Sequence, residues 1–433
     1  MYMNHTRKNK KQNIQGEVLT VIEGWKKISI YGDPYERGYA HGFLLARELK
    51  TVKQTLPFIV REFLKMDVKD YMKRCKDEIA PIVKNSYPEL YNELRGISAG
   101  ARSVGVNVSL AFLIAWNSVL SLYPRNVAPN RCSAFIATGS ATESGEIVMA
   151  HNTHTDFVSG SLLNIIIKVE PTEGHAFVMQ TAPGYIASST DWFLCSSGII
   201  GCETTISKVI FEPDFKKGHP YFCRIRNVMQ YAKTLDECGE LMVKHNAGDY
   251  ACSWLFGNIA TNEIMMLELG SQTHSIQKTL NGLFYGMNSA MDLKLRNTET
   301  NDYDHTNELT SVGARNSRLN HLLNEEYAGK INIQNAKRII SDHYDAHFAR
   351  IEMTSRTICK HSELDEYTEF KPIGCTDAKV TDAKCAAKME FYGIFGSACG
   401  RKFNAKEHVR NHPKYRHWAP HLKDFKNYKW TKL

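Results

Sequence analysis

The sequence lacks the cysteine patterns of zinc-binding and disulfide-stapled proteins. Its eleven cysteines are scattered over 433 residues, with no Cys-x-x-Cys pair and no paired Cys/His spacing that suggests zinc. The count is odd, and a chain of this length does not need disulfide bonds to build a core. His408, His412 and His417 are closely spaced, and we assign them to a structural tail. We therefore expect reduced thiols, no metal and no cofactor.

Long apolar runs are also missing. The longest, Leu110 to Tyr123, is too short to cross a bilayer and predicts a buried helix, so we expect no integral membrane segment. Residues 1–16 are polar and basic without an apolar stretch. They predict a disordered tail, no secretion signal and a cytoplasmic location. No basic face with interleaved aromatic residues stands out, so nucleic acid is not an expected partner.

What the sequence does contain is ordinary globular composition. Hydrophobic residues make up 43% and charged residues 23%, which is enough apolar material for a large core. Lys and Arg total 54 against 46 Asp and Glu, and much of this excess of +8 lies in Arg7–Lys11 and Arg401–Lys432. No internal repeat is visible. We expect one domain over residues 17–433.

The order of the expected elements favours a layered α+β fold over alternating βαβ units. Two strands come first, then amphipathic helices up to Tyr123, and then a block of strands between residues 162 and 206. A helical period over Tyr221–His245 predicts one helix, and the polar segment Met291–Ser311 predicts a loop. Helices are predicted again over residues 312–327 and 333–343.

One stretch carries candidate chemistry. Residues 131–154 form two apolar runs around a loop of small and polar residues, which predicts a β-hairpin centred near Thr142. Such a hairpin sets Cys132 opposite His151 and Asn152. A thiol needs polar neighbours of this kind to act as a nucleophile, because the thiolate is the attacking species. The alternative is that Cys132 is a buried thiol at the start of a core strand.

The segment just before this hairpin is suited to cleavage. Pro124, Pro129 and Asn130 break the helical pattern directly ahead of Cys132 and predict an exposed loop.

Seven short pieces, in their order along the chain, carry a resemblance to a known family. They are Gly32–Gly38 with His41–Gly42, Arg131–Ala134, Met149–Thr153, Glu203–Ile206, Gly286–Asn288, Ser311–Arg318 and Asp342–Tyr344. Together they resemble the autoproteolytic acyltransferase/hydrolase family typified by acyl-coenzyme A:6-aminopenicillanate acyltransferase. The phospholipase B-like proteins are related to it, and all belong to the N-terminal-nucleophile hydrolases.

The resemblance implies a fold and a mechanism. The fold is a four-layer αββα sandwich. The chain would cleave itself between Arg131 and Cys132 into 1–131 and 132–433, which leaves Cys132 with both a thiol and a free α-amine. An α-amine with a pKa near about 8 can serve as general base close to neutral pH. An acyl group would pass to Cys132 and then to water or another acceptor.

The resemblance also implies site residues. His151 and Asn152 fall where the family has polar groups beside the nucleophile, and His154 falls where the acyltransferase has a carboxylate. Arg315 resembles an arginine that reaches the site. Asn288 is a further candidate for an amide near the nucleophile.

The oxyanion donors are harder to assign. Many related hydrolases have an asparagine at the place where this chain has Cys195. The Asn258 side chain and the backbone amides of Ser196–Gly198 are the alternatives that remain.

The function we expect first is that of an amidase or acyltransferase acting on a small-molecule acyl substrate. In the transferase, an acyl-coenzyme A or an amine would be the acceptor. Three other functions stay open. One is a lipid acyl hydrolase of the phospholipase B-like kind. Another is a non-catalytic binding protein that keeps the fold. The third is an unprocessed Cys-His hydrolase with His151 or His154 as its base.

Overall fold

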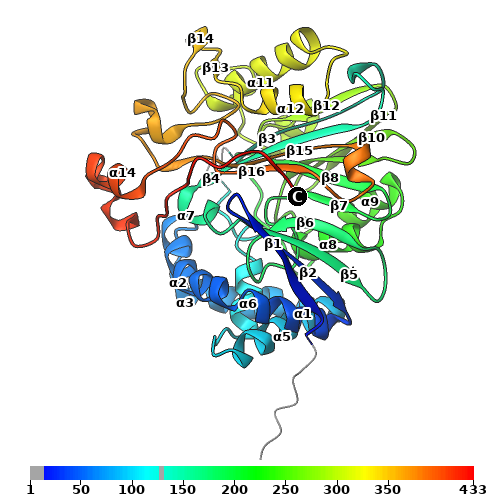
Figure 1. Ribbon diagram of the computed structural model, residues 1–433, viewed down its shortest axis with the longest axis vertical. Helices are drawn as coiled ribbons and strands as arrows, with labels where there is room; N and C mark the ends of the chain where they lie inside the picture. The colour runs from blue at the N-terminus through cyan, green and yellow to red at the C-terminus, as the bar shows by residue number, and fades with distance from the viewer. Residues whose placement is uncertain (1–13, 126–130) are drawn as a thin grey trace, which may run out of the picture.

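The computed structural model describes residues 14–125 and 131–433, and Figure 1 shows them as packed sheets with helices on the outside. Residues 1–13 of the predicted tail, and Pro129 and Asn130 of the predicted cleavage loop, lie outside the described residues.

The larger sheet has nine strands in the order β1-β2-β5-β6-β7-β8-β9-β10-β11. They are β1 Gly16–Ile22, β2 Trp25–Gly32, β5 Ile165–Pro171, β6 Phe177–Thr181, β7 Phe193–Cys195, β8 Ile199–Thr205, β9 Cys252–Asn258, β10 Glu263–Leu269 and β11 His274–Thr279. The β2–β5 pair is parallel, and the other neighbours pair antiparallel.

The smaller sheet has six strands in the order β12-β3-β4-β15-β16-β17. They are β3 Cys132–Thr138, β4 Val148–Asp156, β12 Gly282–Gly286, β15 Ile373–Asp382, β16 Tyr392–Phe395 and β17 Thr431–Lys432. A separate short pair joins β13 Tyr344–Asp345 to β14 Arg350–Ile351. Every residue of β3 is buried, because both faces of the sheet are covered.

The two sheets and their covering helices make four layers. Strand β3 packs against β8, β9 and β10 across the space between the sheets. Helices α8 Tyr221–Tyr231 and α9 Leu235–Val243 pack on β7, β9 and β10 of the larger sheet. On the smaller sheet, α12 Ile333–Ile340 packs on β4 and β15, with α11 Ser311–His321 beside it at the top of Figure 1. The predicted αββα sandwich is confirmed.

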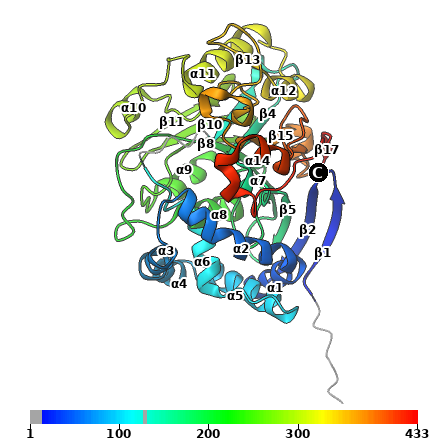
Figure 2. The ribbon, with the colours of Figure 1, turned by 90° about the vertical axis from the view of Figure 1, so that its left-hand side faces the viewer.

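The remaining helices lie around this sandwich. A group at one end, at the bottom of Figure 2, comprises α1 Pro34–Leu44, α2 Ala46–Glu62, α3 Val68–Arg74, α4 Ala80–Ser86, α5 Pro88–Ser103 and α6 Leu110–Asn117. The others are α7 Phe157–Gly160, α10 Leu293–Glu299, α13 Ala383–Ala386 and α14 Ala405–Asn411. None of the described helices combines the length and the apolar character that a membrane span requires.

Two glycines of α1 explain how closely it packs on α5. A Cβ atom on Gly38 would lie 2.1 Å from the carbonyl oxygen of Glu93, and one on Gly42 would lie 2.0 Å from that of Ile97. No larger residue fits between these backbones without moving the helices apart.

The same stretch of α1 positions a loop near the candidate site. The buried Arg37 guanidinium donates to Glu93 of α5 at 2.7 Å, which fixes the two helices together. His41 Nε2 accepts the Gly184 backbone N–H at 2.8 Å, and burial lowers the His41 pKa to about 4, so the ring is neutral and can accept. This bond anchors the loop of residues 182–191, which contributes Ala182, Tyr185 and residues 189–191 to the wall of a cavity.

Two predictions of local structure are wrong. The helix predicted over Tyr221–His245 is divided into α8 and α9, because Thr234 caps α9 and accepts the Glu237 N–H at 3.2 Å. The segment predicted as a loop contains α10, which Asp292 caps by accepting the Leu295 N–H at 2.7 Å.

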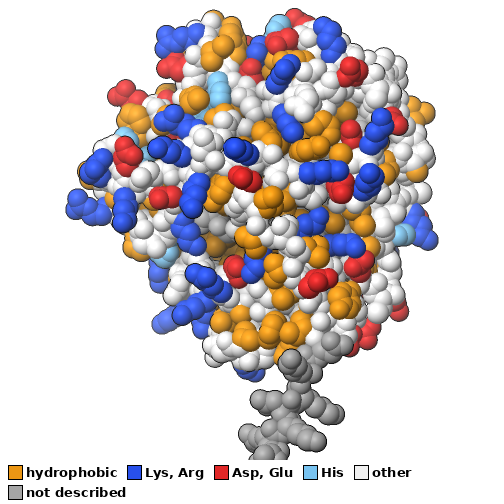
Figure 3. Space-filling view, viewed as in Figure 1, with side chains coloured by type: hydrophobic (Ala, Val, Ile, Leu, Met, Phe, Trp, Pro, Cys, Tyr) orange, Lys and Arg blue, Asp and Glu red, His pale blue; other side chains and the backbone are white. Residues whose placement is uncertain are grey.

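Basic side chains are spread over the face that Figure 3 shows. Many Lys and Arg side chains lie on the left, where Figure 1 places α14, others lie across the centre and right, and acidic side chains are interspersed.

Candidate active site

Cys132 begins β3 and pairs across the hairpin with Thr153 of β4. His151 and Asn152 pair instead with the next two residues of β3, so the predicted register is wrong by one to two positions. Directly opposite side chains of an antiparallel pair share a face, and neighbours along a strand alternate. Asn152 therefore lies on the face away from the Cys132 side chain.

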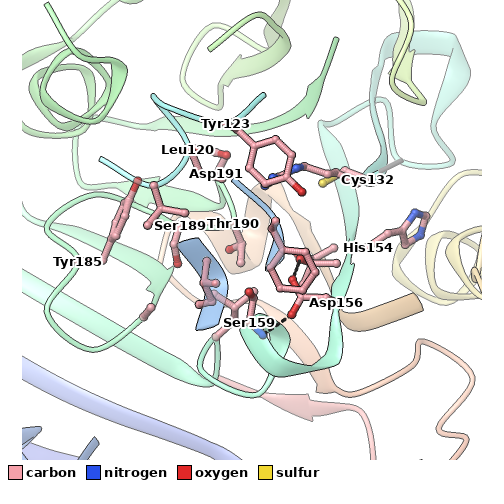
Figure 4. Close-up of a pocket in the computed structure, with 18 of the residues that line it drawn as sticks. Leu120, Tyr123, Cys132, His154, Asp156, Ser159, Tyr185, Ser189, Thr190 and Asp191 are labelled. Carbon is pink, nitrogen blue, oxygen red and sulfur yellow. Dashed lines mark hydrogen bonds between the residues drawn. The ribbon is translucent and has the colours of Figure 1, made fainter. Parts of the chain in front are cut away.

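The Cys132 side chain faces a cavity of about 80 Å³ between the sheets and the N-terminal helices. Figure 4 shows its sulfur beside the Tyr123 ring, with Asp191 on the other side of that ring. The cavity wall is largely apolar on the side of α2 and α6: Ile59, Phe63, Trp116, Val119, Leu120. Polar residues of the loop before β7, of β8 and of the segment before β9 line another part: Ser189, Thr190, Asp191, Glu203, Tyr250.

Two buried side chains hold the backbone of Cys132. The Oδ1 atom of Asn288 accepts the N–H of Cys132 at 3.2 Å and that of Arg131 at 2.9 Å. The guanidinium of Arg315 donates to the Cys132 carbonyl oxygen at 2.6 Å and to Asn288 Oδ1 at 2.9 Å. Both residues, predicted near the nucleophile, thus contact its main chain.

Arg315 is fully buried, and it makes no ion pair with a carboxylate among the described residues. Burial lowers its pKa to about 10, which still leaves the guanidinium charged at neutral pH. Its charge is therefore directed at the Cys132 main chain and at Asn288.

The carbonyl group before Cys132 also has a donor. The backbone N–H of His154 donates to the Arg131 carbonyl oxygen. The Arg131 side chain lies over the Tyr123 ring, with 4.1 Å between guanidinium carbon and ring centroid, and it lines the cavity. The peptide bond between Arg131 and Cys132 is thus held on both sides of its carbonyl carbon.

The side chains of Asn152 and His154 point away from the cavity. Asn152 Nδ2 donates to the carbonyl oxygens of Ile340 and Ile358 at 2.9 Å each, and His154 Nε2 lies 2.9 Å from the Ile358 oxygen. Figure 4 shows the His154 ring directed away from the Cys132 sulfur. The expectation that these side chains flank the thiol is wrong, because the register places them on the helix-covered face.

His151 shares the face of Cys132 but lies two cross-strand pairs further along the hairpin, opposite Ala134. Its ring is fully buried, and within the described ranges neither ring nitrogen has a hydrogen-bond partner. Burial, with the positive charge of Lys379, lowers its pKa well below the ordinary value, so the ring is neutral.

The next strand, β15, supplies a buried ion pair that the sequence reasoning missed. Asp377 is paired with Thr153, and Lys379 with His151, so both side chains share the Cys132 face. Lys379 Nζ lies 2.5 Å from Asp377 Oδ1 and donates to Thr153 Oγ1 at 2.9 Å. One signal in the sequence could have revealed this pair: Asp377 and Lys379 alternate with apolar residues within a strand of a sheet that is buried on both faces.

A second missed group is a pair of buried carboxyls in the cavity wall. Asp191 and Glu203 both accept the hydroxyl of Tyr250, at 3.3 and 3.0 Å. In the part of the chain that the structure describes, their second oxygens have no hydrogen-bond partner. Burial raises the pKa of both, and the proximity of Glu203 raises that of Asp191 further, so Asp191 carries a proton well above its ordinary range.

These surroundings set the state of the thiol. Burial raises the pKa of Cys132 well above its ordinary value, Glu203 adds to the rise, and Lys379 opposes it. In the uncleaved chain the thiol is therefore protonated at neutral pH.

The two suggestions for oxyanion donors are displaced from this site. Asn258 ends β9, whereas Cys252 at the other end of that strand is the residue near Cys132. Six residues of strand span about 20 Å. Gly198 neighbours the same far end, and Asn258 Nδ2, the group that could donate, lies 3.5 Å from the Lys233 carbonyl oxygen. Neither can donate to a group on Cys132.

Comparisons with known proteins give weak matches. No family model matches the sequence. The chain is 25% identical over 268 residues to an uncharacterized protein of Archaeoglobus fulgidus, a match that covers 56% of this chain and 42% of the relative. The chain thus spans less than half the length of the curated relative that it matches.

Solved structures show a distant likeness. A mutant of conjugated bile acid hydrolase from Clostridium perfringens matches with a TM-score of 0.35 and 9% identity, over 61% of this chain and 89% of that one. Penicillin V acylase from Agrobacterium tumefaciens matches with a TM-score of 0.33 and 12% identity, over 60% of this chain and 82% of that one. Scores of this size establish neither an activity nor a substrate for this chain.

Proposed function

We propose that the chain is an autoprocessed cysteine hydrolase whose nucleophile is Cys132 at a new N-terminus. One observation carries this proposal. Asn288 and Arg315 make hydrogen bonds to the main chain of Cys132, while the Cys132 thiol faces a cavity. A core cysteine does not need buried side chains that bind its backbone, whereas an N-terminal nucleophile needs its amine and its carbonyl group fixed in position.

Processing would begin with attack of the Cys132 sulfur on the Arg131 carbonyl carbon. The His154 N–H, which donates to that carbonyl oxygen, would stabilise the negative charge that develops there. The bond from the carbonyl carbon to the Cys132 nitrogen then breaks, and the thiol proton passes to the departing amine. Water hydrolyses the resulting thioester, which leaves the carboxylate of Arg131 on residues 1–131 and a free amine on residues 132–433.

The free α-amine would then act as the base for the thiol. Its pKa of about 8 suits proton transfer near neutral pH. Asn288 Oδ1, which accepts the Cys132 N–H, would orient the amine so that its lone pair is directed to the sulfur. The acyl group of a substrate would pass to the sulfur while the leaving group takes the proton, and water would release the acid.

The cavity suggests the class of substrate. Its apolar wall on α2 and α6 suits a hydrophobic acyl group, and Ser189, Thr190 and Asp191 offer hydrogen bonds to an amide or ester beside it. The protonated carboxyl of Asp191 is a candidate oxyanion donor. Because the Arg131 side chain lines the cavity, release of the new C-terminus would enlarge the space for substrate.

A panel of acyl anilides, acyl esters and phospholipid vesicles, graded by acyl length, tests this function on the processed protein. We expect release of the amine from hydrophobic acyl anilides, with a mass increase of one acyl group on the fragment 132–433 before turnover. Cys132→Ala removes both the turnover and the adduct.

Other outcomes favour the alternatives. Turnover confined to vesicles would indicate a lipid acyl hydrolase. Saturable binding of acyl compounds without turnover would indicate a binding protein. Transfer to an added amine or to coenzyme A, in competition with water, would make the protein an acyltransferase.

A further inference from the structure

A cluster of metal-binding side chains lies on the other side of the smaller sheet from the cavity. It consists of His343, Cys359, His361 and Cys399, whose ligand atoms all lie within 4.8 Å of one another. His343, Cys359 and His361 belong to the segment between α12 and β15, and Cys399 belongs to the turn after β16. Among residues 14–125 and 131–433 this is the one such group of His, Cys, Asp or Glu side chains.

The distances in this cluster match the edges of a zinc tetrahedron. With bonds of about 2.0–2.1 Å to nitrogen and about 2.3 Å to sulfur, tetrahedral zinc separates two nitrogens by about 3.3 Å and a nitrogen from a sulfur by about 3.6 Å. His343 Nε2 and His361 Nε2 are 3.2 Å apart. Cys359 Sγ and Cys399 Sγ lie 3.5 and 3.6 Å from His361 Nε2.

The surroundings orient these ligands. Glu363 Oε1 lies 2.8 Å from His361 Nδ1, so that nitrogen carries the proton and Nε2 is left free to bind a metal. The Ser397 hydroxyl lies 3.4 Å from Cys399 Sγ. A carboxylate behind a ligating histidine is the usual partner of a zinc site.

We propose that His343, Cys359, His361 and Cys399 bind a structural zinc ion. Two thiolates and two imidazoles are the soft and borderline ligands that zinc prefers, and four protein ligands leave no open position for a substrate. The sequence spacing did not indicate this group because its members are dispersed along the chain. His361 follows Cys359 by 2 positions and His343 by 18, and Cys399 follows His361 by 38.

The ion would stabilise a segment that regular structure supports poorly. Between α12 and β15 the described chain contains the two-residue strands β13 and β14 and short 3-10 turns. Ile358, next to the ligand Cys359, provides the carbonyl oxygen that binds the side chains of Asn152 and His154. The metal would thus fix the layer behind β4, and this role does not depend on the proposed enzyme activity.

Metal analysis of protein purified under reducing conditions without chelators tests the proposal. We expect about one zinc ion per chain. Cobalt(II) added to the zinc-free protein should give the visible absorption of a tetrahedral site and the sulfur-to-metal band in the near ultraviolet. A chelator should lower the melting temperature of the wild type, and zinc should restore it.

Variants separate the ligands from other cysteines. Cys399 is exposed, so the fold should tolerate Cys399→Ser. In this variant the sulfur-to-cobalt band should lose the intensity that one thiolate contributes. Its zinc affinity should fall at least tenfold. Glu363→Gln should weaken it about 10–100-fold. Cys385→Ser, outside the cluster, is the matched control and should bind like the wild type.

Two results would overturn the proposal. One is zinc-free wild type with free thiols that gives no tetrahedral cobalt spectrum. The other is a disulfide between Cys359 and Cys399 in protein isolated under reducing conditions, since oxidised sulfurs cannot ligate.

Discussion

The Arg315 guanidinium donates a 2.6 Å hydrogen bond to the carbonyl oxygen of Cys132, on a residue 183 positions earlier in the chain. It does so while fully buried, where an unpaired charge is costly. The hydrogen bond from this buried guanidinium fixes the position of the Cys132 main chain. The role of Cys132 can therefore be tested through the side chains that surround it.

Arg315→Lys should slow self-cleavage by about 10–100-fold, because a lysine cannot reach the Cys132 carbonyl, Ser133 Oγ and Asn288 Oδ1 together. Hydrogen bonds from charged groups contribute about 1.5–3 kcal/mol each, and about 1.4 kcal/mol is a tenfold rate. The rate of self-cleavage is measured by the appearance of the two fragments over time on denaturing gels. Arg338→Lys, on the exposed side of α12, is the control and should cleave at the wild-type rate.

Asn288→Asp should move the acid limb of the pH–rate profile to higher pH by about one unit. A carboxylate beside the α-ammonium of processed Cys132 favours the charged form and raises its pKa, so the free base appears only at higher pH. The measurement is kcat/KM against pH. Asn320→Asp, exposed on α11, adds the same charge at a distance and should leave the limb in place. An unmoved limb in Asn288→Asp would mean that the α-amine is not the base.

His151→Gln and His154→Gln should each keep the shape of the pH–rate profile. Burial holds the pKa of both rings well below the ordinary value, so neither titrates in the neutral range. His154→Gln should still lower the free energy of unfolding by about 0.5–1.5 kcal/mol, because the Ile358 carbonyl keeps the Asn152 amide but loses its second side-chain donor. A fall in rate of about 10²–10⁴ with loss of pH dependence in either variant would favour the unprocessed Cys-His hydrolase.

Lys379→Met should destabilise the protein by about 3–5 kcal/mol, because it leaves the Asp377 carboxylate buried and unpaired. The double variant Asp377→Asn with Lys379→Met should recover much of this loss. Urea denaturation measures both. The single variant should also alkylate more slowly at Cys132, since Lys379 favours the thiolate. Equal stability of the single and double variants would show that the two side chains do not interact.

Asp191→Asn should gain stability over the wild type as pH rises. The Asp191 pKa is raised in the folded chain from about 3.8, so its contribution is fully present below that pH and is lost as pH climbs towards the folded value. A tenfold difference in proton affinity between the folded and unfolded chain corresponds to about 1.4 kcal/mol. The difference in melting temperature between variant and wild type should therefore be small at pH 4 and grow by pH 8. Asn also tolerates the φ of +54° at this position.

The sequence was informative where the signal was local or came from the family pattern. The strands of the hairpin follow from two β-branched runs around a polar loop, and the order of helices and strands indicated the layers. Asn288 and Arg315 were found through short motifs, and both contact Cys132.

The sequence was misleading where a shift of one residue in the pairing of β3 with β4 decides which face of the sheet a side chain occupies. A shift of one position moved Asn152 and His154 from the cavity to the helix-covered side. Partners from distant strands could not be seen at all: Asp377 binds Thr153 from 224 positions away. The zinc ligands were missed for the same reason, since only the fold brings them together.

N-terminal sequencing and intact mass of the purified wild type test the central claim most directly. We expect two fragments, of residues 1–131 and 132–433, the larger beginning with an unblocked Cys132, and a single uncleaved chain for Cys132→Ala. A wild type that remains one intact chain and hydrolyses acyl amides at full rate, or a larger fragment that begins at another residue, would contradict it.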